Sequence, residues 1–377
     1  MTGNPGVVTT VLAFLLVIGP LIFIHEMGHY LVGRLFGVKA DVFSIGFGRE
    51  LFGWSDRRGT RWKVGWLPLG GYVKFAGDMN PASQPSPEWL SLPAAERNRT
   101  FQAKPVLQRF LIVAAGPVTN LLFAIVVFTG LSLALGQPYA PPVIERVEAG
   151  SAAQQAGLRA GDRITRIDGG SVERYEDIYF RVLMKPGGTV SISLERNGHP
   201  LTVTAKLKAV EEHDRFGNRA LIGRLGVLGR PPVWRSASLA EAVGGAFHEV
   251  QRVIGTTVEG IGQILVGKRS VKELGGPLKI AKFSGEQVSL GWLYFVSFIA
   301  VISINLGFIN LLPIPMLDGG HLFFYAIEAV RRKPLGPQAM EWAFRTGLAA
   351  LLALMIFVTL NDLASFGLWS KLGGLIG

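Results

Sequence analysis

No cysteine occurs in the 377-residue chain. This absence excludes disulfide bonds and thiolate metal sites, so any metal must be held by His, Asp or Glu. Charged residues make up only 17% of the chain and hydrophobic residues 49%, a balance that is too apolar for an ordinary soluble protein. We therefore predict an integral membrane protein with room for a domain outside the bilayer.

Four long apolar stretches approach or exceed the roughly 20 residues needed to cross a hydrocarbon core of about 30 Å. They cover about residues 7–30, 106–135, 290–312 and 346–360, and the last is the shortest. No basic residue precedes the first stretch, and no small-residue cleavage site follows its apolar run. We therefore expect it to remain as a span and not to be removed as a signal peptide.

Basic residues are concentrated between the first and second predicted spans and recur at Arg331, Arg332 and Lys333, after the third. The positive-inside rule places both connections in the cytosol. Both termini and the region between spans two and three then lie outside the cytosol, as expected for a multi-pass protein of the bacterial inner membrane. The net charge of +11 follows mostly from these orientation signals, and we expect membrane lipid but no nucleic acid among the partners.

Other segments have their own patterns. Residues 40–77 are rich in β-formers around a Gly70-Gly71 break and predict a small membrane-associated sheet. Residues 79–93, rich in Pro and Ser, predict a cytosolic loop. Residues 239–266 have apolar positions at helical spacing and predict an amphipathic helix at the outer interface. It includes His248, which we take as a surface residue.

The motif His25-Glu26-Met27-Gly28-His29 ends the first span. Two histidines four residues apart project from one face of a helix, so the motif supplies two metal ligands at once. Glu26 can reach a water on the metal without coordinating it, as the general base of a metalloprotease does. Ionisable groups inside a span are costly and are usually functional, which argues against a pair of interfacial histidines.

A catalytic zinc needs three protein ligands and an open position. The stretch "INLLPIPMLDGGH" at the end of span three supplies an acid, Asp318, in a segment where Pro313 and Pro315 forbid a regular helix. Spans one and three run in the same direction, so His29 and Asp318 should arrive at one depth. His321 competes for the third position, but it can equally be a partner of a ligand.

Between spans two and three, "GSAAQQAGLRAGDRI" followed by "IDGGSV" resembles a bacterial PDZ domain over roughly residues 138–208. Such domains usually grip extended peptides at a sheet edge. The predicted fold is thus an α-helical polytopic membrane protein with about four transmembrane helices, a membrane-associated β-sheet and an inserted α+β PDZ-like domain. Its parts are residues 1–136 with the HExxH motif and the sheet, 137–226 with the PDZ-like domain, 227–288 with a linker and amphipathic interfacial helices, and 289–377 with the LDG motif.

Together, "HEMGH", "NLLPIPMLDGG" and the PDZ-like insert resemble the site-2 protease family of intramembrane zinc metalloproteases, and most closely its bacterial sigma-E-regulating branch. The resemblance implies Zn²⁺ held by His25, His29 and Asp318, with Glu26 as catalytic acid/base. It also implies substrate binding by the Asn-x-x-Pro-x-Pro pattern and by the sheet edge, here Asn310, Pro313, Pro315, Gly70, Gly71, Tyr72 and Val73.

The function predicted is hydrolysis of peptide bonds within or near the transmembrane segments of single-span membrane proteins, close to the cytosolic face. An anti-sigma factor or a signal-peptide remnant would be a typical client, trimmed first by another protease, with the PDZ-like domain as the filter. The alternative is a membrane zinc transporter or metal sensor, since His and Asp in spans can also form a transit site. A transporter would normally show repeated metal sites and symmetry between its halves, and neither is apparent in the sequence.

Overall fold

The computed structural model describes residues 5–78, 92–213, 219–267, 270–271, 275–333 and 336–365. The loop predicted at 79–93 therefore lies almost wholly outside the described residues. The chain divides into two compact units: one contains the described residues up to Phe128 and from Gly275 to Leu363, and the other contains mainly the described residues between Thr129 and Leu274.

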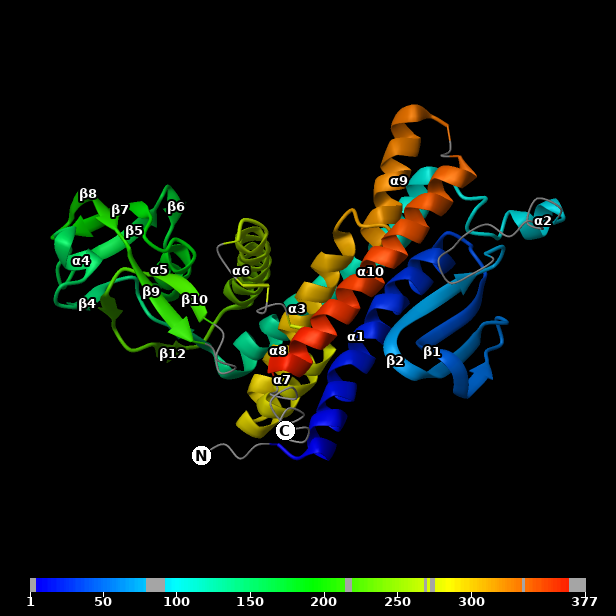
Figure 1. Ribbon diagram of the computed structural model, residues 1–377, viewed down its shortest axis with the longest axis horizontal. Coiled ribbons are helices and arrows are strands. Elements are labelled where there is room, and N and C mark those ends of the chain that lie inside the picture. Colours follow the sequence, from blue (N-terminus) through cyan, green and yellow to red (C-terminus); the bar gives the residue numbers. More distant parts are fainter. Residues whose placement is uncertain are drawn as a thin grey trace, which may run out of the picture. The chain divides into compact units, whose positions relative to one another are not determined.

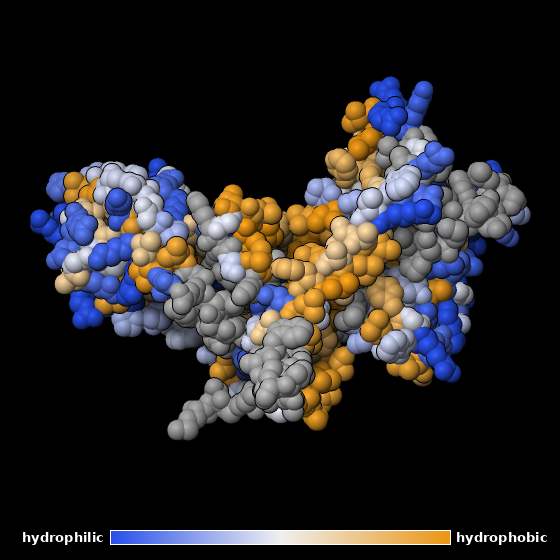
Figure 2. All heavy atoms as spheres, viewed as in Figure 1, coloured by the Kyte–Doolittle hydropathy of each residue, from blue (hydrophilic) through white to orange (hydrophobic). Residues whose placement is uncertain are grey.

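Four helices are long and apolar enough to cross a membrane, and they confirm the four predicted spans. They are α1 (Val7–Leu35), α3 (Val106–Leu135), α8 (Trp292–Leu311) and most of α10 (Pro337–Ser365), shown in Figure 1. Hydrophobic residues cover much of their visible surface in Figure 2, where a soluble protein would carry polar groups. The protein is therefore a multi-pass membrane protein.

The sheet of the first unit consists of two long bent strands, β1 (Ala40–Ser55) and β2 (Arg61–Phe75). The register pairs Val42–Ile45 with Arg61–Val64 on one side and with Gly71–Lys74 on the other. The Gly70-Gly71 break that we predicted is an irregularity within β2, which continues through it. Strands β1 and β2 both contact α1, and so bring the Gly71–Lys74 segment beside the helix that carries the histidine motif.

A hydrophobic cluster packs around the part of α1 that follows the histidine motif. Phe43 of β1 stacks on Trp62 of β2, and Tyr30 of α1 packs edge-on against both rings. The buried members of this cluster are Tyr30, Val38, Ala40, Phe43, Val73, Phe75, Phe101, Ile112, Val113, Leu322 and Tyr325. The cluster joins α1, the sheet, α3 and α9 (Asp318–Arg331), and therefore fixes the segments that lead to the predicted site.

The second unit contains the PDZ-like domain. Its main sheet has the strand order β6-β5-β7-β8 (Gly170–Ser171, Arg163–Ile167, Thr189–Arg196 and His199–Lys206). Three two-stranded sheets pair β4 (Ile144–Val147) with β11 (Val227–Gly229), β9 (Lys208–His213) with β10 (Arg219–Arg224), and β3 (Gln137–Tyr139) with β12 (Val233–Arg235). Helices α4 (Ala152–Gln155) and α5 (Tyr175–Leu183) contribute side chains to its apolar core.

The remaining helices are α2 (Ala94–Arg97), α6 (Leu239–Leu265) and α7 (Pro277–Leu290). Helix α6 is the amphipathic helix predicted at 239–266, and it begins with a capping box between Ser238 and Glu241. The connection expected after span three contains helix α9, whose last residue is Arg331. The paired prolines stop α8 at Leu311, and the chain resumes a helix at Asp318 because Gly319 and Gly320 let its first turn pack against the bend.

Candidate metal centre

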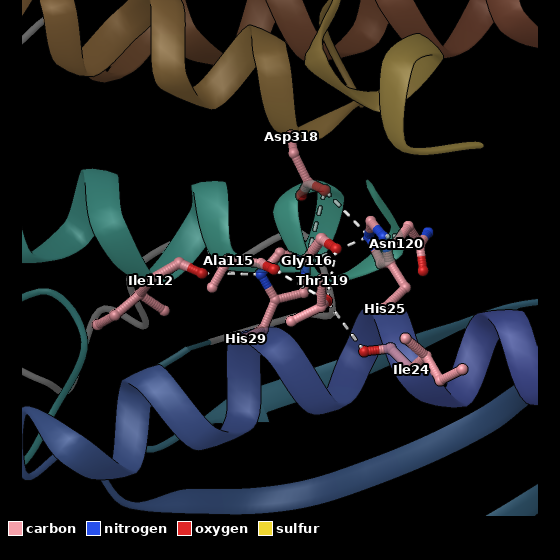
Figure 3. Close-up of polar contacts among 9 residues, drawn as sticks. All are labelled: Ile24, His25, His29, Ile112, Ala115, Gly116, Thr119, Asn120 and Asp318. Atoms are coloured by element: carbon pink, nitrogen blue, oxygen red, sulfur yellow. Dashed lines mark hydrogen bonds and ion pairs between the residues drawn. The ribbon is translucent and has the colours of Figure 1, made fainter. Parts of the chain in front are cut away.

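The histidine motif lies on the buried face of α1. His25 and His29 are 8% and 9% exposed, and their side chains point the same way, as Figure 3 shows. This follows from the four-residue spacing on a helix of about 3.6 residues per turn. Gly28 lets α3 approach closely, since a Cβ at that position would lie 2.4 Å from the carbonyl oxygen of Ala115. The glycine of the motif is therefore a helix-packing residue.

Helix α3 holds the second histidine. His29 Nδ1 lies 2.9 Å from the carbonyl oxygen of Ile112. A carbonyl oxygen can only accept, so His29 Nδ1 must carry the proton and donate it. The neutral ring then presents the lone pair of its Nε2 atom, which is the form that binds a metal. Gly116 makes room for this ring, because a Cβ there would lie 2.2 Å from His29 Nε2.

Asp318 approaches the two rings from the bend between α8 and α9 (Figure 3). One of its oxygens, Oδ2, lies 3.0 Å from His25 Nε2 and 3.5 Å from His29 Nε2. The two Nε2 atoms are 3.3 Å apart. The structure therefore brings together two histidines and an aspartate from segments almost 300 positions apart in the sequence.

These three atoms have the spacing of metal ligands. Four ligands placed tetrahedrally at about 2.0–2.1 Å from zinc are separated from one another by about 3.3–3.4 Å, and the three distances here are 3.0, 3.3 and 3.5 Å. Asp318 Oδ2 is buried and makes no hydrogen bond within the described residues. An unpartnered carboxylate oxygen beside two nitrogen lone pairs is unfavourable unless a cation lies among them. The residues present therefore fit zinc.

Glu26 lies next to this group. Glu26 is 7% exposed, and Val73 of β2 lines the same cavity beside it. Gly71 has no side chain to obstruct it, since a Cβ there would lie 2.9 Å from Glu26 Cγ. In the described part of the chain, His25, His29 and Asp318 form the group that could hold a metal, and Glu26 is not part of it. It is placed to exchange protons.

A cavity of about 680 Å³ opens at the three ligands. Its lining combines the ligands and Glu26 with residues of the sheet edge, the bend and α10: Ile22, His25, Glu26, His29, Phe47, Gly70, Gly71, Tyr72, Val73, Phe75, Phe101, Ile112, Val113, Leu306, Asn310, Met316, Leu317, Asp318, His321, Leu348 and Leu351. The lining is mostly apolar with few polar groups, as binding sites usually are.

The residues that the sequence associates with substrate fall into two groups. Asn310, Gly70, Gly71, Tyr72 and Val73 line the cavity beside the metal ligands. Pro313 and Pro315 are in the bend but are not among the described lining residues. Pro315 instead packs against α10, where a Cβ on Gly347 would lie 2.5 Å from its ring. Pro315 thus packs against α10 and lies outside the described lining of the cavity.

His321, the alternative candidate for the third metal ligand, lies among aromatic side chains. His321 packs its ring against Phe344, with centroids 4.9 Å apart, and is not one of the metal-ligand group among the described residues. Burial lowers the pKa of His321, although Asp318 opposes the shift. His248 is on the exposed surface of α6 in the second unit.

Two polar residues of α3, Thr119 and Asn120, lie beside the motif and were not predicted from the sequence. The Thr119 hydroxyl lies within hydrogen-bond distance of three carbonyl oxygens, those of Ile24 (3.1 Å), Ala115 (3.0 Å) and Gly116 (2.7 Å). The Asn120 amide lies 3.2 Å from His25 Nδ1. Both are drawn in Figure 3. Asn120 could have been found, because an amide in the middle of a predicted span is expensive to bury and is usually functional.

Comparison with known proteins agrees with this geometry. The model of peptidase family M50, the site-2 protease family, matches residues 13–354. The chain belongs to peptidase family M50. This M50 peptidase is 42% identical over 94% of its length, and over 96% of the relative, to a protein of Agrobacterium fabrum that carries the name "Putative zinc metalloprotease". It is 35% identical to "Metalloprotease MmpA" of Caulobacter vibrioides over 98% of this chain and 99% of the relative.

Among solved structures, the M50 peptidase is similar to PDZ domains of SdrC-like proteins from Listeria monocytogenes and Listeria innocua. Identities are 24% and 25%, and each match covers 25% of this chain and 90% or 99% of the solved one, with TM-scores of 0.20 and 0.21. The family depends on zinc, so the protein is a zinc metalloprotease of the membrane.

Proposed function

We propose that this M50 peptidase is an intramembrane endopeptidase that hydrolyses peptide bonds within or near the transmembrane segments of single-span membrane proteins. His25, His29 and Asp318 hold the zinc, and Glu26 is the catalytic acid/base. The observation that carries the proposal is that three atoms able to bind a metal, two from α1 and one from the start of α9, lie within 4.8 Å of one another in a cavity that Glu26 also lines.

Zinc, when bound, supplies Lewis-acid activation of a water molecule and of the scissile carbonyl. The protein supplies the proton transfers. Glu26 accepts the proton of the attacking water and returns it to the nitrogen of the leaving amine, so its carboxylate ends the cycle as it began. Because Glu26 is buried and packs against Gly71 of β2, its side chain stays oriented between turnovers.

A substrate helix must unwind before it can be cleaved, since its carbonyl groups are engaged in internal hydrogen bonds. The freed backbone groups then need new partners at membrane depth. Gly70, Gly71, Tyr72 and Val73 line the cavity beside Glu26, and among the described residues Gly71–Val73 pair with β1 and with no other strand. This supports docking of an extended substrate along that segment by strand addition, with Asn310 across the cavity.

The orientation of the protein in the membrane is inferred from the positions of its basic residues. Basic residues between α1 and α3 and at Arg331–Lys333 favour a cytosolic position for both connections, with both termini and the PDZ-like domain outside. We infer a location in the bacterial inner membrane and cleavage near its cytosolic face. The PDZ-like domain would then filter clients, so that a protein trimmed by an earlier protease is accepted. An anti-sigma factor or a signal-peptide remnant would be such a client.

The test is cleavage of a single-span reporter by purified protein. Glu26→Gln keeps the size and the hydrogen-bonding capacity of the side chain but is a poor base, so we expect the rate to fall by at least about 10²-fold, the usual range for a lost general base, with zinc content unchanged. The matched control is E341Q, which alters an exposed glutamate of α10 and should leave the rate unchanged. Cleavage by E26Q at the wild-type rate would refute the role of Glu26.

A further inference from the structure

Asn120 is an amide in the middle of a membrane-spanning helix. It belongs to α3, it is completely buried (0% exposed), and its amide nitrogen is placed 3.2 Å from His25 Nδ1. A buried amide normally satisfies both its oxygen and its nitrogen. Here, however, Asn120 Oδ1 has no hydrogen-bond partner within the described residues.

The ring it contacts has only one nitrogen left for a metal. His25 Nε2 faces Asp318 Oδ2 at 3.0 Å, on the side where zinc fits, so Nδ1 faces Asn120. A neutral imidazole whose Nε2 atom supplies a lone pair carries its proton on Nδ1. The atom that His25 Nδ1 meets must then be an acceptor, which the amide nitrogen of Asn120 is not.

Rotating the amide by 180° resolves both discrepancies. Side-chain amide oxygen and nitrogen have nearly the same shape, and their assignment follows from the hydrogen bonds they make. With Oδ1 toward the ring, the orphaned oxygen of Asn120 receives the N–H of His25. We propose that Asn120 is the positioning residue of His25: its amide oxygen accepts from His25 Nδ1 and holds the Nε2 lone pair toward the metal site. This inference rests on the proposed role of His25 as a zinc ligand.

Contacts with α8 fix the position of Asn120 beside His25. Its backbone oxygen accepts a hydrogen bond of 2.9 Å from the hydroxyl of Ser303 in α8. Gly307, one turn further along α8, allows close contact, because a Cβ there would lie 3.3 Å from Asn120 Cβ. Helix α8 leads into the bend that carries Asp318. Asn120 therefore contacts both α1, which carries the two histidines, and α8, which precedes Asp318 in the chain.

The two histidines are thus oriented in different ways. His29 donates to a backbone carbonyl, that of Ile112, which no substitution removes. His25 depends on a side chain, so its orientation can be tested by mutation. Partners of this kind typically contribute about 10–100-fold to metal affinity.

The experiment measures zinc affinity by competition with a chromogenic chelator, on full-length protein purified in detergent. N120L removes the acceptor and keeps a side chain branched at the same atom, and N120D keeps an oxygen in the same position. T119V is the matched control, because it removes the neighbouring hydroxyl, which lies 3.1 Å from the carbonyl oxygen of Ile24 in α1, and leaves His25 untouched. We expect N120L to bind zinc about 10–100-fold more weakly, and N120D and T119V to bind it like the wild type.

Equal loss of affinity in N120L and N120D would show that Asn120 acts by packing and would overturn the inference, as would normal zinc binding by N120L. A wild-type protein that binds no zinc would overturn the proposed function as well. If N120L cannot be purified as a folded protein, the zinc-loaded wild type labelled with ¹⁵N-histidine decides. A His25 ring protonated on Nδ1 supports the inference, and a ring protonated on Nε2 overturns it.

Discussion

At the scale of single residues, the site depends on glycines at close contacts between elements as much as on its histidines and carboxylates. Gly28, Gly71 and Gly116 each have an atom of another element within 3 Å of where a Cβ would stand. Real Cβ atoms do not approach so closely, so these glycines set the distances between α1, β2 and α3. His25, His29 and Glu26 were predictable from their motif, whereas these glycines were not, because a sequence does not reveal which glycines face a neighbouring helix.

Gly116→Ala tests this directly. The added methyl group would overlap His29 Nε2, which cannot retreat without breaking the bond from His29 Nδ1 to Ile112. We expect zinc affinity to fall at least about tenfold, the lower end of what a lost ligand orientation costs, and cleavage to fall with it.

The control is Gly130→Ala on the same helix, where no atom lies within 4 Å of the added methyl. Alanine is the better helix former by about 1 kcal/mol, so G130A should bind zinc normally and unfold at the same or a higher temperature. Equal zinc binding by G116A and the wild type would contradict the account.

At the scale of elements, the bend between α8 and α9 decides where Asp318 lies. The prolines predicted the end of α8, and the parity of the spans predicted that His29 and Asp318 would meet. Helix α9 was not predicted, because apolar length identifies spans but says little about a short helix of mixed polarity after a bend. The irregular pairing of β1 with β2 was also beyond prediction, since strand register is a property of tertiary contacts.

Gly319→Ala should displace this bend. The methyl group would lie 2.1 Å from the carbonyl oxygen of Leu312, so the first turn of α9 must move and take Asp318 with it. We expect at least about tenfold weaker zinc binding, as for other losses of ligand position. The control is G336A, just before α10, where no atom lies within 4 Å. A G319A protein with wild-type zinc affinity would show that the bend is pliable and that Asp318 does not depend on it.

At the scale of the whole molecule, we propose that the unit with the metal centre hydrolyses the substrate and that the unit with the PDZ-like domain selects it. The strand pairing offers a clean way to separate them. Tyr139 of β3 is opposite Val233 of β12, so residues 140–232 can be replaced by a two-residue Asn-Gly turn, which suits an antiparallel hairpin.

The shortened protein should bind zinc and cleave a trimmed single-span reporter as the wild type does, and it should also cleave an untrimmed reporter that the wild type rejects. Both reporters are compared in one detergent or one lipid mixture, with E26Q as the blank. Loss of cleavage of the trimmed reporter, with zinc retained, would argue against a filter and for a direct catalytic role of the PDZ-like domain.

The central claim is that one zinc ion is held between α1 and the first residue of α9 in a membrane protein. Metal analysis of the purified wild type, E26Q and D318A tests it most directly. We predict about one zinc per chain in the wild type and in E26Q, because Glu26 is not a ligand, and little zinc in D318A. Full zinc content in D318A, or none in the wild type, would contradict the account.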